Sequence, residues 1–215
     1  MSISPLLPCF SADAYRVGEI ADMTVMLARI APAPIDGYLV DLSPLRKLLV
    51  VGAGGGAWLS ANGLPDPRLM QRIAAADGRW VARIGALQVL VGSGLACDLA
   101  ERTVLTSASA NRTVLHYDAV ELAFGGVSAT PILAELCALD LTQFPTDAWI
   151  ATLFAGVEVG LYRDDAKAPH YRLVCAGAEA LFLFETLAEM TREFGGAVIG
   201  YTEYLNAMEQ RGRVQ

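Results

Sequence analysis

The sequence has few of the residues that most binding and catalytic chemistries need. Among its 215 residues there are two histidines and two lysines, Lys47 and Lys167, and the net charge is −7. A protein that binds nucleic acid or an anionic membrane needs a block of basic residues to neutralise phosphates. This chain has no such block, so neither nucleic acid nor a membrane surface is expected as its partner.

Long hydrophobic runs are also missing. No segment reaches the roughly 18 uninterrupted apolar residues that a transmembrane helix needs. The first residues carry no basic region, and their apolar stretch is broken by Pro5 and Pro8, so they do not resemble a signal peptide. These absences predict a cytoplasmic protein.

The four cysteines do not have the spacing of a metal site. No two of them form a Cys-x-x-Cys pair, and His116 and His170 are the only histidines, so a zinc site of ordinary spacing cannot be written. We expect the cysteines to be small buried residues in a reducing compartment. We expect His116 to be hydrogen-bonded within a strand and His170 to be exposed at the start of one. The cysteines are Cys9, Cys97, Cys137 and Cys175.

What the sequence has in excess is apolar residues. They make up 54% of the chain, against 18% charged residues, which is rich for a soluble protein. Either the chain is simply rich in alanine, or another subunit covers part of its apolar surface. Composition leaves both explanations open.

Hydrophobic periodicity and turn residues predict an α+β fold. A strand, glycine and short helix follow one another twice, around Gly52 and around Gly125, which indicates a duplicated topology. We expect an N-terminal extension over 1–22, one domain over 23–205 with possible halves 23–110 and 111–205, and a tail over 206–215. The expected strands are 38–51 (one or two), 79–84, 87–91, 114–124, 150–154, 157–163 and 170–175; the expected helices are 54–60, 68–76, 129–137 and 178–194. Residues 23–30 and 97–110 fit more than one assignment.

One glycine-rich segment is typical of a dinucleotide site. The stretch LLVVGAGGGAWL places Gly52, Gly54 and Ala57 in a G-x-G-x-x-A pattern after an apolar strand. Such a site also needs a long helix behind the loop and, about 20 residues on, an acid at the end of a parallel strand. Here the helix lasts about two turns, and the acid at that distance, Asp77, begins a strand. The sequence therefore favours a packing turn, and no P-loop motif occurs.

Other catalytic patterns are scarce. The Gly-x-Ser-x-Gly elbow is missing, Asp164 and Asp165 are expected in a solvated turn, and Glu185 and Glu189 lie on the polar face of an amphipathic helix. A Cys–His pair brought together by folding stays open. We assign no catalytic, cofactor-binding or metal-binding residue.

The second half of the chain carries two motifs in a fixed order. Residues 137–145 read CALDLTQFP, and residues 150–164 read IATLFAGVEVGLYRD, followed by a strand and the amphipathic helix. This order resembles the gamma subunit of heterotetrameric sarcosine oxidase, with Ala138 where that family has proline. The matching residues are Cys137, Leu139, Asp140, Leu141, Phe144, Thr152 and Arg163.

Upstream segments are similar to the wider aminomethyltransferase (glycine-cleavage T-protein) superfamily. They are DLS at 41–43 with KLLVVG at 47–52, and VELAFGG at 120–126 with TPIL at 130–133. The resemblance implies an aminomethyltransferase-like (folate-binding-domain) fold with an antiparallel sheet and a C-terminal amphipathic helix. The K-G-C-x-x-G-Q motif of folate-binding relatives is absent, so no folate site is carried over.

The resemblance also implies a function. The chain would be a non-catalytic assembly subunit of a flavin-dependent complex that demethylates sarcosine or a related N-methyl amino acid or amine. It would bind no cofactor; FAD, FMN, NAD and tetrahydrofolate would belong to larger flavoprotein and folate-binding subunits. Trp58, Trp149 and Tyr162 are candidate interface anchors, with core packing as the alternative. A stand-alone folate-dependent methyl- or aminomethyl-transferase and a nucleotide-binding protein built on Gly52–Ala57 are the other hypotheses.

Overall fold

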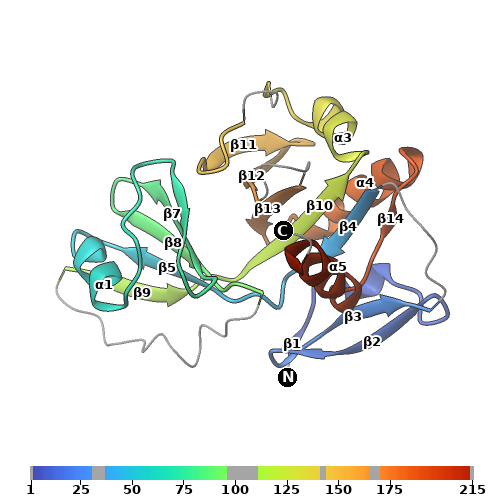
Figure 1. Ribbon diagram of the computed structural model, residues 1–215, viewed down its shortest axis with the longest axis horizontal. Coiled ribbons are helices and arrows are strands. Elements are labelled where there is room, and N and C mark those ends of the chain that lie inside the picture. Colours follow the sequence, from blue (N-terminus) through green and yellow to red (C-terminus); the bar gives the residue numbers. More distant parts are fainter. Residues whose placement is uncertain (1, 31–36, 96–110, 141–143, 165–169, 214–215) are drawn as a thin grey trace. The chain divides into compact units, whose positions relative to one another are not determined.

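The chain folds into two compact units, and each unit is made of segments that are separated in the sequence (Figure 1). The computed structural model describes residues 2–30, 37–95, 111–140, 144–164 and 170–213, with side chains as far as Glu209. Unit 1 comprises Met1–Pro44, Val120–Thr146 and Thr152–Gln215, and unit 2 comprises Leu45–Ala119 and Asp147–Ala151. The domain boundaries expected from the sequence stay a prediction.

Unit 1 is built on a six-stranded sheet with the order β11-β12-β13-β10-β4-β14. Its central strands β4 and β10 pair antiparallel, and nearly every residue in both is buried. A run of this kind indicates a strand covered on both faces. The strands are β4 (Gly37–Asp41), β10 (Ala119–Gly126), β11 (Ile150–Phe154), β12 (Val157–Arg163), β13 (His170–Ala176) and β14 (Ala197–Val198).

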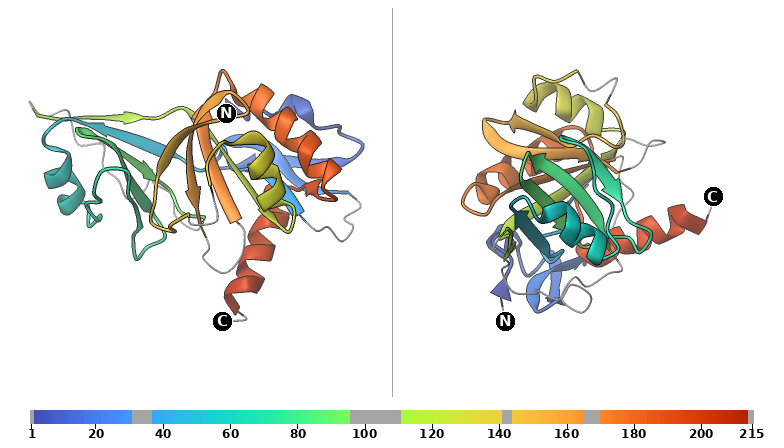
Figure 2. Two further views of the ribbon diagram at one scale, coloured as in Figure 1. Left: turned by 90° about the horizontal axis from the view of Figure 1, so that it is seen from above. Right: turned by 90° about the vertical axis from the view of Figure 1, so that its left-hand side faces the viewer.

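A smaller sheet and several helical segments make up the rest of the described part of unit 1. The smaller sheet has the order β1-β3-β2. Helix α4 contacts β4, β14 and α3, whereas α5 contacts β3 and β4, and the C-terminal part of α5 projects outward (Figure 2). These elements are β1 (Ser2–Ile3), η1 (Leu7–Cys9), β2 (Tyr15–Ile20), β3 (Met23–Arg29), α3 (Ala129–Leu136), α4 (Ala180–Glu193) and α5 (Tyr201–Arg213).

Helix α4 follows the periodicity that predicted it. Its buried residues recur at helical spacing on one face, which is the face that packs on the sheet. The helix ends at Glu193 with Phe194 as its C-cap, and Gly195 has a φ of 77°, a left-handed conformation that glycine adopts without strain. The buried residues are Ala180, Leu183, Phe184, Leu187, Ala188 and Thr191.

The described residues of unit 2 form a five-stranded sheet, β6-β7-β8-β5-β9, and a short helix, α1 (Gly55–Ala61). Its core is an apolar cluster that the sheet and the region of α1 share. The strands are β5 (Lys47–Val51), β6 (Arg72–Ala74), β7 (Trp80–Gly85), β8 (Gln88–Gly92) and β9 (Thr113–His116). The buried cluster is Leu48, Val50, Trp58, Leu59, Leu64, Val81, Val89 and Val91.

Most of the expected elements are confirmed, with three differences. The single strand expected over 114–124 is two strands, β9 and β10, which belong to different sheets. Residues 68–76 do not form a helix, because Arg72–Ala74 pair with β7 and this tertiary pairing outweighs local preference. Helix α5 was not predicted, although Tyr201, Tyr204, Leu205 and Met208 have helical spacing. Residues 23–30, left open, form β3, and residues 97–110 lie outside the described ranges.

Both strand–glycine–helix segments are present. Strand β5 is followed by Gly52, with a φ of 121°, and α1; strand β10 ends at Gly126, with a φ of 91°, before α3. No helix in the described part of the chain is long and apolar enough to cross a membrane.

Candidate functional site

The glycine loop after β5 is filled by the protein's own backbone. The N–H of Gly52 donates to the carbonyl oxygen of Leu87 at 2.8 Å, and the N–H of Gly54 donates to that of Asn111 at 2.9 Å. A Cβ atom on Gly52 would collide with the Asn111 carbonyl. Both strands beside β5 are antiparallel to it, unlike the parallel crossover of a dinucleotide fold. The loop is therefore a packing turn, and its two glycine N–H groups are already bonded.

The most concentrated polar chemistry lies inside unit 1. Glu121 on β10 is 0% exposed, and its Oε1 accepts hydrogen bonds from Arg172 Nη1 at 2.9 Å and Tyr162 Oη at 2.8 Å. Arg172 Nη2 lies 3.4 Å from the Tyr204 hydroxyl, which is 2.9 Å from His170 Nε2. Three neighbouring strands and helix α5 thus meet in one buried network.

Arg172 joins this network to a second carboxylate. Its Nη2 lies 2.9 Å from Asp164 Oδ2. Burial by itself lowers the pKa of Arg172, but Tyr162, Asp164, Tyr204 and Glu121 together hold that pKa well above its ordinary value. The expectation that Asp164 lies in a merely solvated turn was therefore wrong, because it is an ion-pair partner; Asp165 lies outside the described residues.

Burial also raises the pKa values of two tyrosines in α5, Tyr201 and Tyr204. It raises the pKa of Tyr204 to about 12, against the opposing effect of Arg172. It raises the pKa of Tyr201 in the same direction. Both phenols therefore stay neutral and can act as hydrogen-bond donors at neutral pH.

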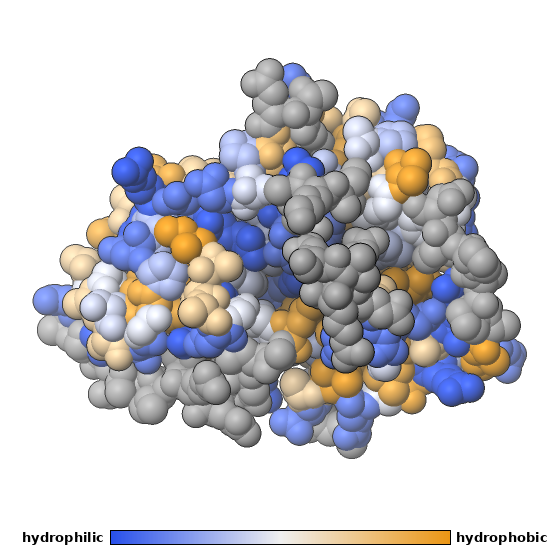
Figure 3. All heavy atoms as spheres, in the orientation of Figure 1, coloured by the Kyte–Doolittle hydropathy of each residue, from blue (hydrophilic) through white to orange (hydrophobic). Residues whose placement is uncertain are grey.

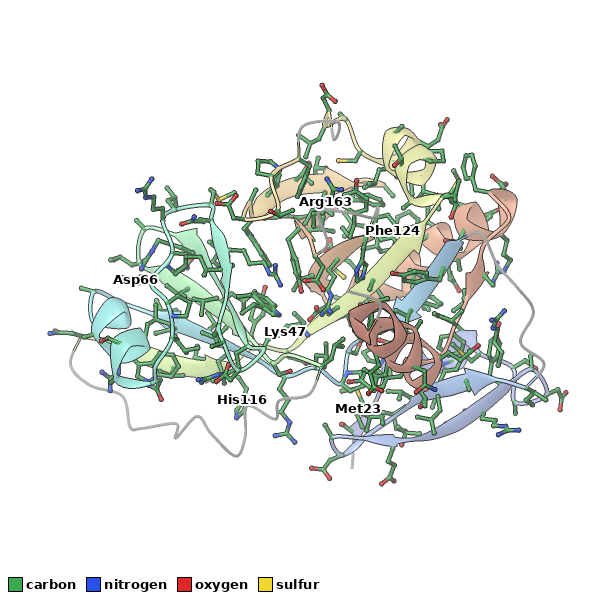
Figure 4. All side chains as sticks on the ribbon, viewed as in Figure 1. Met23, Lys47, Asp66, His116, Phe124 and Arg163 are labelled. Atoms are coloured by element: carbon green, nitrogen blue, oxygen red, sulfur yellow. The ribbon has the colours of Figure 1, made fainter. Side chains whose placement is uncertain are left out.

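His170 is one of the residues that the sequence misplaced. It was expected to be exposed, but it is 2% exposed, beside Tyr38 on β4 and Tyr204 on α5. The reason is that β13 is an interior strand of the sheet and α5 packs near it. His116, in contrast, is exposed on the edge strand β9 (Figure 4).

Sequence reasoning missed Glu121 and Arg172 altogether. The available signal was a single charged residue inside an otherwise apolar strand, VELAF for Glu121 and YRLVC for Arg172. A buried charge needs a partner, but the sequence does not say which residue supplies it. Because these groups are buried and bonded to one another, the network orients β10, β12, β13 and α5 relative to one another.

A second buried carboxylate ties the N-terminal segment to the main sheet of unit 1. Asp41 on β4 accepts hydrogen bonds from the hydroxyl of Ser4 and, through Oδ1, from the N–H of Ser43 at 2.9 Å and its hydroxyl at 2.5 Å. Its oxygens are therefore occupied by the chain itself, so Asp41 holds structure in place.

An open pocket of about 250 Å³ lies between the N-terminal segment and α4. Its lining residues are Cys9, Phe10, Tyr15, Phe184, Glu185, Ala188, Arg192 and Val198. Burial raises the pKa of the Cys9 thiol, and the carboxylates of Glu185 and Asp41 raise it further. A protonated thiol is a poor nucleophile, so this pocket is suited to binding and not to attack by Cys9.

The three aromatic residues proposed as interface anchors are all interior. Trp58 is 1% exposed, Trp149 is 4% exposed and stacks on Trp80 with 5.7 Å between ring centroids, and Tyr162 is 0% exposed. The expectation of exposed anchors was wrong, and the alternative, core packing, describes all three. Large aromatic side chains are highly buried on average, and the local sequence pattern does not show whether a particular one is buried.

The remaining candidates are placed as follows. Cys137 and Cys175 are buried, Cys9 is partly buried, and Cys97 lies outside the described residues. Glu185 and Glu189 are exposed on α4, as expected. In the described ranges, no group of three or more His, Cys, Asp or Glu side chains is arranged to hold a metal ion.

Comparisons with solved structures show which fold this is. The glycine cleavage system aminomethyltransferase T of Bartonella henselae is 15% identical with a TM-score of 0.71, over 94% of this chain and 60% of that chain. A chain of the heterotetrameric sarcosine oxidase of Corynebacterium sp. U-96, in complex with pyrrole 2-carboxylate, is 19% identical with a TM-score of 0.64, over 77% of this chain and 89% of that chain.

This chain therefore spans less than two thirds of aminomethyltransferase T and most of the sarcosine oxidase chain. No protein-family model and no curated protein sequence matches it. The structural likeness confirms the expected α+β, aminomethyltransferase-like fold.

Proposed function

We propose, from its aminomethyltransferase-like fold, that this chain is a non-catalytic assembly subunit of a multi-subunit flavin-dependent oxidase or dehydrogenase. The complex would oxidatively demethylate sarcosine or a related N-methyl amino acid or amine. The observation that carries the proposal is the match over 89% of a chain of a heterotetrameric sarcosine oxidase, compared with 60% of aminomethyltransferase T.

Two features of the chain support this role. Its apolar fraction of 54% fits a surface that is partly covered by other subunits. The glycine loop, which was the strongest nucleotide-binding pattern in the sequence, is already filled by Asn111 and Leu87. FAD, FMN, NAD and tetrahydrofolate would then be held by larger flavoprotein and folate-binding subunits in the cytoplasm.

The pocket beside α4 does not fit tetrahydrofolate. Pockets for drug-sized ligands span about 300–1,000 Å³, and this one measures about 250 Å³. Its lining includes both a carboxylate, Glu185, and a cation, Arg192, so its charge alone does not select for or against folate. In the proposed complex, a partner subunit would hold the folate.

Co-expression tests the proposal. The chain is produced alone and together with the proteins encoded beside it, and each preparation is examined by size-exclusion chromatography with light scattering. We expect a stable hetero-oligomer that contains flavin and oxidises sarcosine or a related amine, and aggregation when the chain is alone. A monodisperse monomer that forms no complex with those proteins would contradict the proposal.

A second candidate is a stand-alone folate-dependent methyl- or aminomethyl-transferase. The TM-score of 0.71 against aminomethyltransferase T over 94% of this chain favours it. Calorimetric titration of the isolated chain with tetrahydrofolate separates the two candidates. Micromolar affinity with methyl or aminomethyl transfer would support this second function, and no heat of binding would exclude it.

A further inference from the structure

The outer face of α4 is apolar and acidic at the same time. Leu181 is 45% exposed and Phe182 is 58% exposed at its N-terminal end, and Phe194, just after its last residue, is 37% exposed. Figure 3 shows the opposite face of the molecule, where hydrophobic and hydrophilic residues are intermingled. Single exposed apolar residues are ordinary. The adjacent pair Leu181 and Phe182 is the apolar part of this face, and Phe194 lies about 18 Å away along the helix axis.

The pocket opens on this same face. Leu181, Glu185, Ala188 and Arg192 follow one another at spacings of four, three and four residues, so they form one row along the helix. The last three of them line the pocket. Leu181 continues this row by one turn towards the start of α4, beyond the residues that line the pocket.

Aromatic rings form the floor of the pocket. Phe10 makes edge-to-face contacts with Tyr15 and with Phe184, each with 5.4 Å between ring centroids. Aromatic pairs prefer such edge-to-face or offset arrangements, so another aromatic ring in the pocket would find favourable contacts. With a volume of about 250 Å³, below the usual range for drug-sized ligands, the pocket suits one large side chain better than a cofactor.

The charges on α4 indicate which kind of molecule supplies that side chain. Glu185, Glu189 and Glu193 are exposed along the helix, with Arg192 as the only exposed cation of α4. A symmetric contact with a second copy would bring the same carboxylates together, and like charges in an interface are costly. A partner with basic side chains complements this face.

We propose that the pocket between residues 9–15 and α4 receives a large aromatic side chain of a different subunit, beside which an arginine or lysine pairs with Glu185. This inference rests on the proposed function and names the surface through which the chain would assemble. Aromatic anchors in such pockets, with a ring of polar contacts around them, commonly dominate the energy of protein interfaces.

Charge reversal tests the surface in the co-expressed complex. Glu185→Lys is compared with Glu158→Lys, a matched change at an exposed position of β12 in the same unit. We expect Glu185→Lys to weaken assembly at least tenfold and Glu158→Lys to leave it within twofold, with unchanged circular dichroism for both. Equal effects of the two variants on a complex that the unaltered chain does form would overturn this inference alone.

Photo-cross-linking identifies the occupant. A benzoylphenylalanine at position 192 is expected to cross-link to the larger subunit, next to an aromatic and a basic residue, and one at position 158 is not. Cross-links between two copies of this chain, or a small molecule retained in the pocket in native mass spectrometry, would overturn the choice of occupant. If the unaltered chain forms no hetero-oligomer at all, the proposed function itself fails.

Discussion

The interiors of the two units are built from different kinds of side chain. In unit 2 the cluster that includes Trp58 and Leu59 is wholly apolar. The buried cations Lys47 and Arg79 are not members of it: Lys47 donates to the backbone carbonyl of Leu45 at 2.6 Å, and Arg79 pairs at 2.7 Å with Asp77, whose side chain is 25% exposed. In unit 1 the ion pair of Glu121 and Arg172 lies in the middle of the sheet. An apolar interior is stabilised by the area it buries, whereas a charged interior depends on every partner being in place.

The distribution of tryptophan allows the two units to be followed separately. Trp58, Trp80 and Trp149 are the three tryptophans of the chain, and all belong to unit 2. Tryptophan fluorescence therefore reports the unfolding of unit 2, while far-ultraviolet circular dichroism reports both units.

The largest effect is expected where a charge loses its partner. Glu121→Gln should destabilise unit 1 by about 3–5 kcal/mol, because it leaves the Arg172 cation buried with Asp164 as its remaining carboxylate. Urea unfolding followed by circular dichroism measures the loss, and the fluorescence transition should stay in place. The double variant Glu121→Leu with Arg172→Met is the control and should lose less than the single one. A single-variant loss below about 1 kcal/mol would refute the contrast between the interiors.

The next largest effect is expected at high pH, where unit 1 should lose more stability than unit 2. The pKa of Tyr204 is raised to about 12 from 10.0, so its contribution to stability is complete below pH 10 and is lost as the pH rises through about 12. Two pH units correspond to about 2–3 kcal/mol. We expect the circular dichroism transition to weaken by this amount between pH 10 and 12, and more than the fluorescence transition.

Tyr204→Phe is the matched variant for the pH experiment. It should make the stability of unit 1 less dependent on pH over this range, while Tyr201, whose pKa burial also raises, keeps part of the dependence. An unchanged slope in the variant would show that other groups are responsible.

In unit 2 we expect stability to depend most on backbone conformation and not on a buried charge. Gly52→Ala should cost about 2 kcal/mol, because the residue has a φ of 121° and its Cβ would meet the Asn111 carbonyl. Gly63→Ala, at a φ of 65° with open space around it, should cost about 1 kcal/mol. Fluorescence-detected unfolding compares the two. Equal losses would mean that the close approach of residue 111 contributes nothing.

The smallest expected effect is a gain in unit 1. Ala155 and Gly156 form the turn between β11 and β12 with φ values of 51° and 83°, for which Asn-Gly is the favoured pair. Ala155→Asn should therefore stabilise unit 1 by about 0.5 kcal/mol, seen in circular dichroism, and Ala155→Val should destabilise it. A loss of stability in the asparagine variant would contradict this explanation of the turn.

Much of the fold could be predicted because its signals are local. Val157, Val159 and Leu161 alternate with more exposed residues, and β12 follows that pattern. Strand β6 could not be predicted, because three residues such as Arg72–Ala74 become a strand only when a neighbour pairs with them.

The polar network could not be predicted from the sequence for the same reason. Glu121 and Arg172 are 51 positions apart, and each stands alone in an apolar strand. The sequence indicates at most that each needs a partner. Pairing in the sheet is what makes them neighbours, and it also buries His170 and Tyr162, which sequence reasoning placed elsewhere.

By itself the sequence determined the α+β class, the order of most elements and the failure of the glycine loop as a nucleotide site, since the short helix and the misplaced acid Asp77 are both local facts. Only the tertiary structure decided that Trp58, Trp149 and Tyr162 are interior, that Asp164 is an ion-pair partner, and that the pocket lies beside α4. The physical reason is that backbone conformation follows from neighbouring residues, whereas burial and partnership depend on which distant segments pack together.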